Sequence, residues 1–290
     1  MTTRRKRFEL MVFEPERRRL LVGDDIGPEH ARDLFLCLPG LLETRQSFEE
    51  FAQHVAPSAR VMAVDWCGRG DSTRLNGAHD YRMSVYLSDL SLFYSHAIGA
   101  LGAMGATDRA PRIHLVGTSM GGLLAVFLAS HKPRHLGAVI LNDVGPLLPW
   151  SGVFSLMTGI TSAKGADVGA SLARSLTAGM PSASDIGGAE LAGRLNVDPA
   201  LLRAVRQPNH LDLPHETRLA GVDFSNAFAA VTAPILLLRG QHSEIVNDAV
   251  VKRLFEIHPL TRIHECQDSA HPVAYGPDVC SAVLDFVNKH

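Results

Sequence analysis

The most informative segment of the sequence is Ile113-His114-Leu115-Val116-Gly117-Thr118-Ser119-Met120-Gly121-Gly122. A short apolar run ends in Gly-x-Ser-x-Gly, and the small and apolar residues of 123–129 follow at once. This order predicts a buried strand, a sharp turn with Ser119 at its apex, and a helix. Glycines beside the serine are expected, because so sharp a turn brings strand and helix close enough for side chains to clash. The helix directs its N-terminus at Ser119, where its dipole favours an anion.

Short apolar runs alternate with helical patterns on both sides of this turn. Strands are predicted at 34–38, 61–64, 113–117, 137–141, 234–238 and 262–266, after an opening hairpin formed by 8–13 and 17–22. Helices are predicted at 47–55, where Ser47-Phe48-Glu49-Glu50 has the capping-box pattern, and at 85–101, 120–131, 247–257 and 277–288. The alternation predicts an α/β fold: a mostly parallel, doubly wound sheet of about eight strands with helices on both faces.

The alternation stops between Gly145 and about Phe224. No strand is predicted there, Gly, Ala and Ser become frequent around 159–188, and helical pieces are expected at 165–178, 188–195 and 198–205. A segment of this length is too long for a simple loop inside a compact domain. We therefore expect a core formed by residues 1–144 and 225–290, with a helical lid inserted at 145–224.

The composition indicates which cellular compartment and which kinds of partner to expect. Hydrophobic residues make up 46% of the 290 residues, charged residues 20%, and the net charge is −2, which favours a folded protein without a nucleic-acid partner. No apolar stretch reaches the roughly 20 residues that a membrane span needs. The four cysteines show neither close pairing nor zinc-type spacing, which is typical of a reducing compartment. We expect a cytoplasmic protein that acts on a small molecule.

Three side chains near the ends of predicted strands could accompany Ser119 in catalysis. A serine nucleophile needs a base to take its proton and an acid to orient that base. His271 follows the final strand and is the predicted base. Glu244 is the one carboxylate in the loop after 234–238, and it is the predicted acid. Asp143, just past the preceding strand, is the alternative acid, although its carboxylate could instead stabilise the turn.

Several motifs together resemble the α/β-hydrolase fold superfamily. Gly117-Thr118-Ser119-Met120-Gly121 is similar to its nucleophile elbow, and Leu38-Pro39-Gly40-Leu41-Leu42 stands where the family usually has His-Gly-x. The loop Asp65-Trp66-Cys67-Gly68-Arg69-Gly70-Asp71-Ser72 is similar to the family's Asp-x-x-Gly-x-Gly-x-Ser. Leu141-Asn142-Asp143-Val144-Gly145-Pro146 resembles the lid entrance of a bacterial subgroup, and Arg239-Gly240-Gln241-His242-Ser243-Glu244 resembles that subgroup's acid loop, where the acid is usually Asp.

The resemblance implies an oxyanion hole formed by the backbone N–H groups of Leu41 and Met120. It implies a lidded serine hydrolase that cleaves a carboxylic ester or a lactone through an acyl-enzyme. A serine at the elbow argues against the dehalogenases and epoxide hydrolases of the superfamily, which use an aspartate. Thioester or carbon–carbon bond hydrolysis, acyl transfer and a non-catalytic ligand-binding role remain alternatives. Pro39 in place of the family histidine, and the longer Glu244, are departures from the pattern.

Substrate contacts are predicted at Gly40, Trp150 and Phe154, although the two aromatic residues could equally form the packing face of a lid helix. His210, Asp212 and His215 form a polar cluster that we interpret as a solvated turn before Pro214 rather than a metal site. The stretch Gly68-Arg69-Gly70 lacks the pattern of a dinucleotide-binding loop. We therefore predict neither a metal nor a cofactor.

Overall fold

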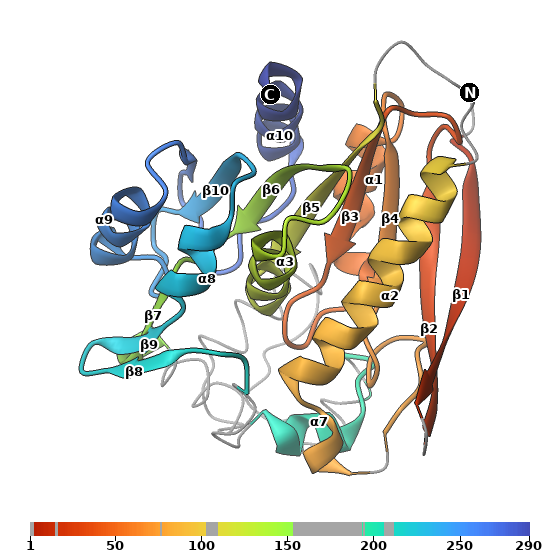
Figure 1. The fold of residues 1–290 in the computed structure, drawn as a ribbon, viewed down its shortest axis with the longest axis horizontal. Helices are drawn as coiled ribbons and strands as arrows, with labels where there is room; N and C mark the ends of the chain where they lie inside the picture. Colours follow the sequence, from red (N-terminus) through yellow and green to blue (C-terminus); the bar gives the residue numbers. More distant parts are fainter. Residues whose placement is uncertain are drawn as a thin grey trace.

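A computed structural model describes residues 3–14, 17–75, 77–102, 110–152, 193, 195–205 and 212–290. Within these ranges the main sheet has eight strands in the order β1-β2-β4-β3-β5-β6-β10-β11 (Figure 1). The hairpin of β1 (Arg5–Glu14) and β2 (Arg17–Ile26) forms one edge, and β2 runs antiparallel to β4 (Arg60–Asp65). The rest of the sheet is parallel: β3 (Asp33–Leu38), β5 (Arg112–Thr118), β6 (Leu136–Asn142), β10 (Ile235–Gly240) and β11 (Arg262–Cys266). The predicted doubly wound α/β sheet is confirmed.

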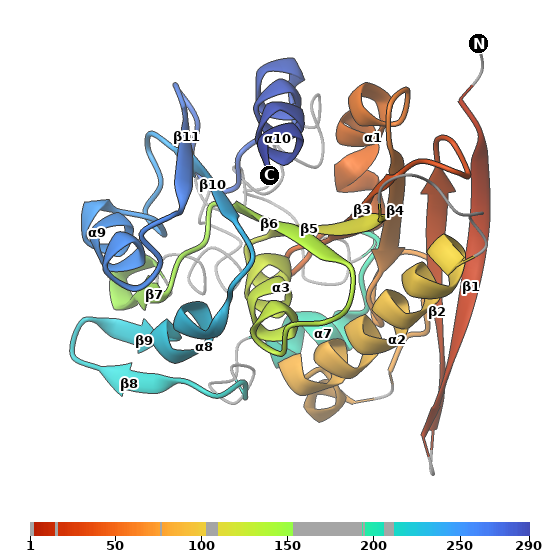
Figure 2. The same cartoon turned by 45° about the horizontal axis from the view of Figure 1, so that its top comes forward.

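Helices cover both faces of this sheet. Figure 2 shows α1 (Glu49–Val55) and α10 (Pro277–Lys289) on one face, and α2 (Met83–Gly102), α3 (Met120–Ser130) and α8 (Ser225–Ala230) on the other. The buried side chains accordingly form two clusters. Strand β3 contributes to both, because Leu34 and Leu36 join the α2–α3 side while Phe35 and Cys37 join the α1–α10 side. Helix α9 (Asp248–Ile257) packs on the α3 side through Val250 and Leu254.

The described part of 145–224 is not entirely helical, which corrects the sequence prediction. It contains α7 (Pro199–Ala204) and a small sheet in the order β7-β9-β8, formed by Leu147–Pro149, Gly221–Asp223 and Glu216–Arg218. Strands of three residues are too short to show an alternating pattern, and β7 pairs with a strand far along the chain. The helices expected at 165–178 and in most of 188–195 lie outside the described residues.

The first helix also begins differently from the prediction. A short 3₁₀ helix (Arg45–Phe48) precedes α1, and Thr44 rather than Ser47 caps it, by accepting a hydrogen bond from the Gln46 N–H. The Ser47 hydroxyl is buried instead of capping a helix. The capping-box pattern therefore identified the helix but misplaced its start by two residues.

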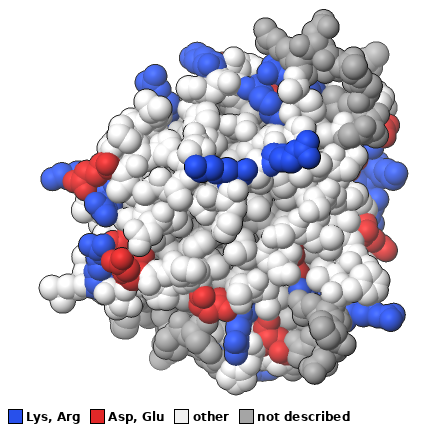
Figure 3. Space-filling model, viewed as in Figure 1, with Lys and Arg blue, Asp and Glu red and all other residues white. Residues whose placement is uncertain are grey.

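Charged side chains are scattered over the face of the molecule drawn in Figure 3, with basic and acidic groups among uncharged surface. Across the described parts of the chain, no helix combines the length and the apolar character that crossing a membrane requires.

The start of α3 lies directly against the ends of β3 and β5. A Cβ atom added at Gly117 would lie 2.5 Å from the carbonyl carbon of Gly121, and one added at Gly121 would lie 2.0 Å from the Leu38 oxygen. Both distances are far below van der Waals contact with backbone atoms that cannot move independently. Only glycine fits at either position, as the sequence predicted.

This packing generates a stability prediction. We expect Gly117→Ala to lower the free energy of unfolding by about 1–3 kcal/mol, because the added methyl group overlaps the backbone of α3. Gly99→Ala is the matched control, since a Cβ at this helical glycine meets nothing within 4 Å. It should raise the free energy of unfolding by about 0.5–1 kcal/mol through helix propensity. Urea denaturation measures both, and a Gly117→Ala protein as stable as the wild type would contradict the packing described.

Candidate active site

Ser119 occupies a strained backbone conformation between β5 and α3. Its φ is 51° and its ψ is −114°, a region that residues with a side chain rarely adopt. The Ser119 N–H donates to the Asn142 oxygen at 3.0 Å, and the Ser119 oxygen accepts from the Gly122 N–H at 2.9 Å. These bonds fix the turn on both sides. The serine is therefore held at the apex of the elbow, at the carboxyl end of β5.

His271 reaches Ser119 from the loop after β11. Its Nε2 lies 3.1 Å from Ser119 Oγ, although 152 positions separate the two residues in sequence. The loop is fixed by the Asn142 side chain, whose Nδ2 donates to the Val273 oxygen at 2.8 Å while its Oδ1 accepts from the Val273 N–H at 2.9 Å. The end of β6 thus holds the backbone two residues beyond the imidazole.

Asp143 lies on the other side of the imidazole. Its Oδ2 is 2.8 Å from His271 Nδ1, and the carboxylate is fully buried. The same carboxylate accepts hydrogen bonds from the Gly240 N–H at 3.1 Å and the Ser243 hydroxyl at 2.6 Å. Three donors from two neighbouring loops therefore surround Asp143, which compensates for its burial. A left-handed backbone conformation, with φ of 53°, directs it toward His271.

Glu244, the acid favoured from sequence, lies in the loop after β10 with its side chain exposed. In this loop the Ser243 hydroxyl, and not Glu244, donates a hydrogen bond to the Asp143 carboxylate. The carboxylate beside His271 Nδ1 is that of Asp143. The geometry therefore favours the alternative acid, Asp143, over Glu244. The physical reason is that β6 and β10 are adjacent parallel strands, so that their two loops end at the same place and either could supply the carboxylate.

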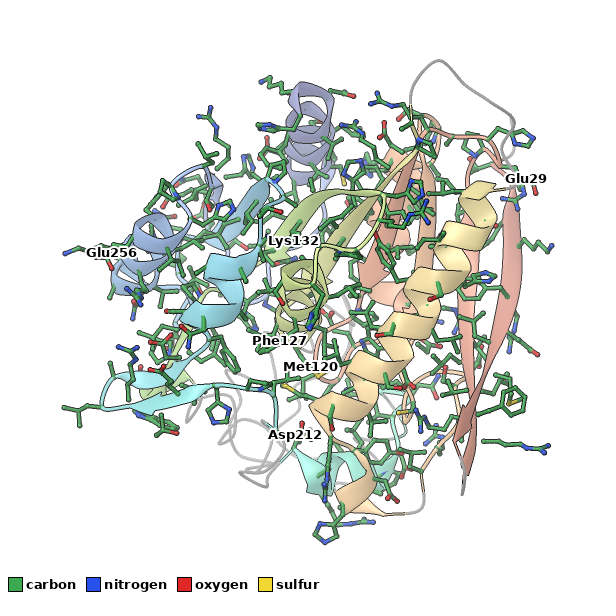
Figure 4. All side chains as sticks on the ribbon, in the orientation of Figure 1. Glu29, Met120, Phe127, Lys132, Asp212 and Glu256 are labelled. Carbon is green, nitrogen blue, oxygen red and sulfur yellow. The ribbon has the colours of Figure 1, made fainter. Side chains whose placement is uncertain are left out.

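The loop after β3 lies against the elbow, where the resemblance implied an oxyanion hole. A Cβ atom on Gly40 would lie 3.3 Å from the Thr118 oxygen, so the loop passes directly over the end of β5. Within the described ranges of the chain, neither the Leu41 N–H nor the Met120 N–H has a hydrogen-bond acceptor. Met120 begins α3, and Figure 4 shows it with Phe127 farther along the same helix. The Gly40 N–H, in contrast, donates to Glu43 Oε2 at 2.7 Å and is not free to bind a substrate.

Glu43 is a buried carboxyl group at this loop. Burial raises the pKa of Glu43 above its usual range, while the Gly40 N–H, His271 and Arg69 act in the opposite direction. The sequence motifs contain Arg69, Asn142 and Ser243 but predict no functional role for them, and no motif includes Glu43. The adjacency of Asn142 to Asp143, and the place of Ser243 three residues after Gly240, are the signals that could have drawn attention to two of them.

Trp150 and Asp212 form hydrogen bonds with residues outside the Ser119–His271–Asp143 group. The Trp150 Nε1–H donates to the Arg218 oxygen at 2.9 Å, and Phe154 lies outside the described residues. Asp212 accepts from the Ser84 N–H and hydroxyl at 3.0 and 2.6 Å and lies near the start of α2 (Figure 4). No group of His, Cys, Asp and Glu suited to a metal ion occurs among the described residues. Substrate contacts of Gly40, Trp150 and Phe154 stay predictions.

Comparison with known proteins agrees with this architecture. The model of the alpha/beta hydrolase fold family matches residues 33–271, which include the elbow, Asp143 and His271. This match covers most of the chain, and the chain belongs to the α/β-hydrolase fold family. Some relatives and structural neighbours are named as hydrolases or esterases.

Individual relatives are similar over part of their length. The chain is 30% identical over 131 residues to a 3-hydroxybutyrate-oligomer hydrolase of Cupriavidus necator, an alignment of 45% of this chain and 40% of the relative. It is 29% identical over 135 residues to a putative 2-succinyl-6-hydroxy-2,4-cyclohexadiene-1-carboxylate synthase of Bacillus subtilis, covering 46% and 44%. The chain thus spans less than half of either relative. A putative hydrolase from Rickettsia typhi shares the fold over 100% of both chains, with a TM-score of 0.71 at 16% identity.

The contact between His271 and Asp143 can be tested without a substrate. A proton shared in a charge-assisted N–H···O hydrogen bond is strongly deshielded, so we expect a far-downfield proton NMR resonance from His271 Nδ1–H. Asp143→Asn should remove or shift this resonance, whereas Glu244→Gln should leave it in place. Loss of the signal in Glu244→Gln with retention in Asp143→Asn would contradict the geometry.

Proposed function

We propose that this protein is a serine hydrolase that cleaves a carboxylic ester or lactone of a small organic substrate through an acyl-enzyme. The observation that carries the proposal is the continuous chain of hydrogen bonds from Ser119 Oγ through His271 to Asp143, with distances of 3.1 and 2.8 Å. In this proposal Ser119 is the nucleophile, His271 the general base and Asp143 the acid. The name of the 3-hydroxybutyrate-oligomer hydrolase relative supports hydrolysis as the reaction.

The first half of the reaction forms the acyl-enzyme. His271 Nε2 takes the proton of the Ser119 hydroxyl as Ser119 Oγ attacks the carbonyl carbon of the substrate. The carbonyl oxygen becomes an oxyanion, which the N–H groups of Leu41 and Met120 stabilise, together with the positive end of the α3 dipole. Asp143 stabilises the imidazolium that results. His271 then gives its proton to the departing alkoxide, which leaves as an alcohol, or stays attached as a hydroxyl group when the substrate is a lactone.

The second half releases the acid. Water takes the place of the alcohol, His271 removes one of its protons, and the hydroxide attacks the acyl carbonyl carbon. The same two N–H groups hold the oxyanion, and collapse of this intermediate breaks the bond to Ser119. The Ser119 oxygen recovers its proton from His271. Hydrogen bonds from Gly240, Ser243 and His271 hold the Asp143 carboxylate beside the imidazole through both halves of the reaction.

The roles of the two carboxylates generate a kinetic prediction. With a p-nitrophenyl ester as substrate, Asp143→Asn should lower kcat by roughly 10³–10⁴-fold, because the amide no longer holds the correct imidazole tautomer or balances the imidazolium charge. Glu244→Gln should change kcat by less than about two-fold, as expected of a solvated loop residue.

Ser119→Ala is the control for the nucleophile and should abolish turnover above the background rate. A wild-type protein that is folded but does not turn over esters or lactones would contradict the proposed function. An active enzyme in which Glu244→Gln loses as much activity as we expect of Asp143→Asn would contradict the assignment of the acid.

A further inference from the structure

The peptide group between Pro39 and Gly40 is held at both ends. The Trp66 indole Nε1–H donates to the Pro39 oxygen at 3.0 Å, and the Gly40 N–H donates to Glu43 Oε2 at 2.7 Å. A peptide group is planar, so two hydrogen bonds at its opposite ends fix its orientation. This peptide group immediately precedes the one that carries the Leu41 N–H.

The peptide group after Leu41 is held by Arg69. The Arg69 Nε–H donates to the Leu41 oxygen at 2.9 Å, and the Arg69 Nη2–H donates to the same oxygen. The Leu41 N–H therefore belongs to a peptide group whose two neighbours are both fixed by side chains. The remaining backbone contact, from the Glu43 N–H to the Gly40 oxygen at 3.4 Å, closes the turn on the carbonyl side of that same peptide group.

The Arg69 guanidinium and the Glu43 carboxyl are groups whose charged forms are costly to bury. Arg69 is fully buried and Glu43 is 5% exposed. The rest of the Arg69 guanidinium is accommodated by the Cys67 oxygen, which accepts from Nη1 at 3.1 Å, and by the Tyr86 ring, 4.8 Å from Cζ. Apolar residues at positions 43 and 69 would avoid the desolvation cost. They would, however, leave the Gly40 N–H and the Leu41 oxygen without these hydrogen-bond partners.

The backbone of Arg69 faces a different part of the chain. Arg69 forms an isolated β-bridge with Val197, the Gly70 N–H donates to the Asn196 oxygen at 2.8 Å, and the Asp198 N–H donates to the Gly68 oxygen at 2.7 Å. The backbone on either side of Arg69 is thus bonded to the segment before α7, while the Arg69 side chain is bonded to the loop after β3.

We propose that Glu43 and Arg69 are positioning residues that set the direction of the Leu41 N–H in the oxyanion hole, and that Arg69 couples this loop to the Asn196–Asp198 segment. The mechanistic part rests on the proposed function. In this chain Pro39 stands at the position of the family histidine, and the peptide groups of the loop are bonded by Trp66, Glu43 and Arg69.

Hydrogen exchange measured by mass spectrometry tests the positioning without requiring turnover. Glu43→Ala should raise exchange in the segment 38–45, because Gly40 loses its acceptor. Glu43→Gln should leave exchange close to the wild type, since its amide oxygen still accepts from Gly40. Arg69→Lys should raise exchange in 38–45, because lysine lacks the planar fork that holds the Leu41 and Cys67 oxygens. Exchange in 195–205 should rise with it, because the proposed coupling passes through the backbone on either side of residue 69 to Asn196–Asp198. Unchanged exchange in 38–45 for folded Glu43→Ala and Arg69→Lys would overturn the proposal.

Steady-state kinetics test the consequence for catalysis. Glu43→Ala should lower kcat for a p-nitrophenyl ester by about 10–100-fold and leave KM within about two-fold, since the oxyanion bond is made mainly in the transition state. Glu43→Gln should recover most of kcat.

Asp223→Ala is the matched control for Glu43→Ala, because it removes another buried carboxylate that accepts a backbone N–H, from Ser225 at 2.7 Å. It should lower the unfolding temperature without changing kcat. A folded Glu43→Ala with wild-type kcat, or a Glu43→Gln as slow as Glu43→Ala, would overturn the positioning role. A wild-type enzyme without turnover, combined with the expected exchange pattern, would instead contradict the proposed function alone.

Discussion

The close approach of α3 to the ends of β3 and β5 is the constraint on which the site depends. Gly117 and Gly121 permit it, since a methyl group at either position would overlap backbone atoms. The approach forces Ser119 into a left-handed conformation and puts its hydroxyl beyond the sheet. It also brings Leu38 and Pro39 against the first turn of α3, since their backbone oxygens would lie 2.0 and 2.8 Å from a Cβ atom on Gly121. The packing of α3 against the ends of β3 and β5 therefore fixes the position of Ser119.

The end of β6 supplies the second fixed point. Asn142 holds the backbone of the His271 loop with two hydrogen bonds, and the next residue, Asp143, contacts the imidazole itself. Because the Ser119 N–H also donates to the Asn142 oxygen, one dipeptide is bonded to both the elbow and the histidine loop. The separation of Ser119 and His271 is therefore controlled by the neighbouring strands β5 and β6, rather than by the flexible part of any loop.

The sequence predicted those features that depend on local patterns. The alternation of apolar runs and helices defined the sheet, and the glycines around Ser119 defined the elbow. The sequence could not decide whether Asp143 or Glu244 is the acid, because the two residues follow adjacent strands. Only the directions of their side chains distinguish them. The strands β7, β8 and β9 were missed because each has only three residues, and because β7 pairs with a strand far along the chain. Glu43 and Arg69 carry no local pattern, since their partners are backbone atoms that the fold brings near.

Covalent labelling by a fluorophosphonate, with the modified peptide located by mass spectrometry, tests directly whether Ser119 is an activated nucleophile. We expect one adduct per chain on Ser119, formed by attack of Oγ on phosphorus with loss of fluoride, and no adduct in Ser119→Ala. A folded wild-type protein that does not react, or that reacts at another residue and still does so in Ser119→Ala, would contradict the proposal that the elbow holds an activated nucleophile.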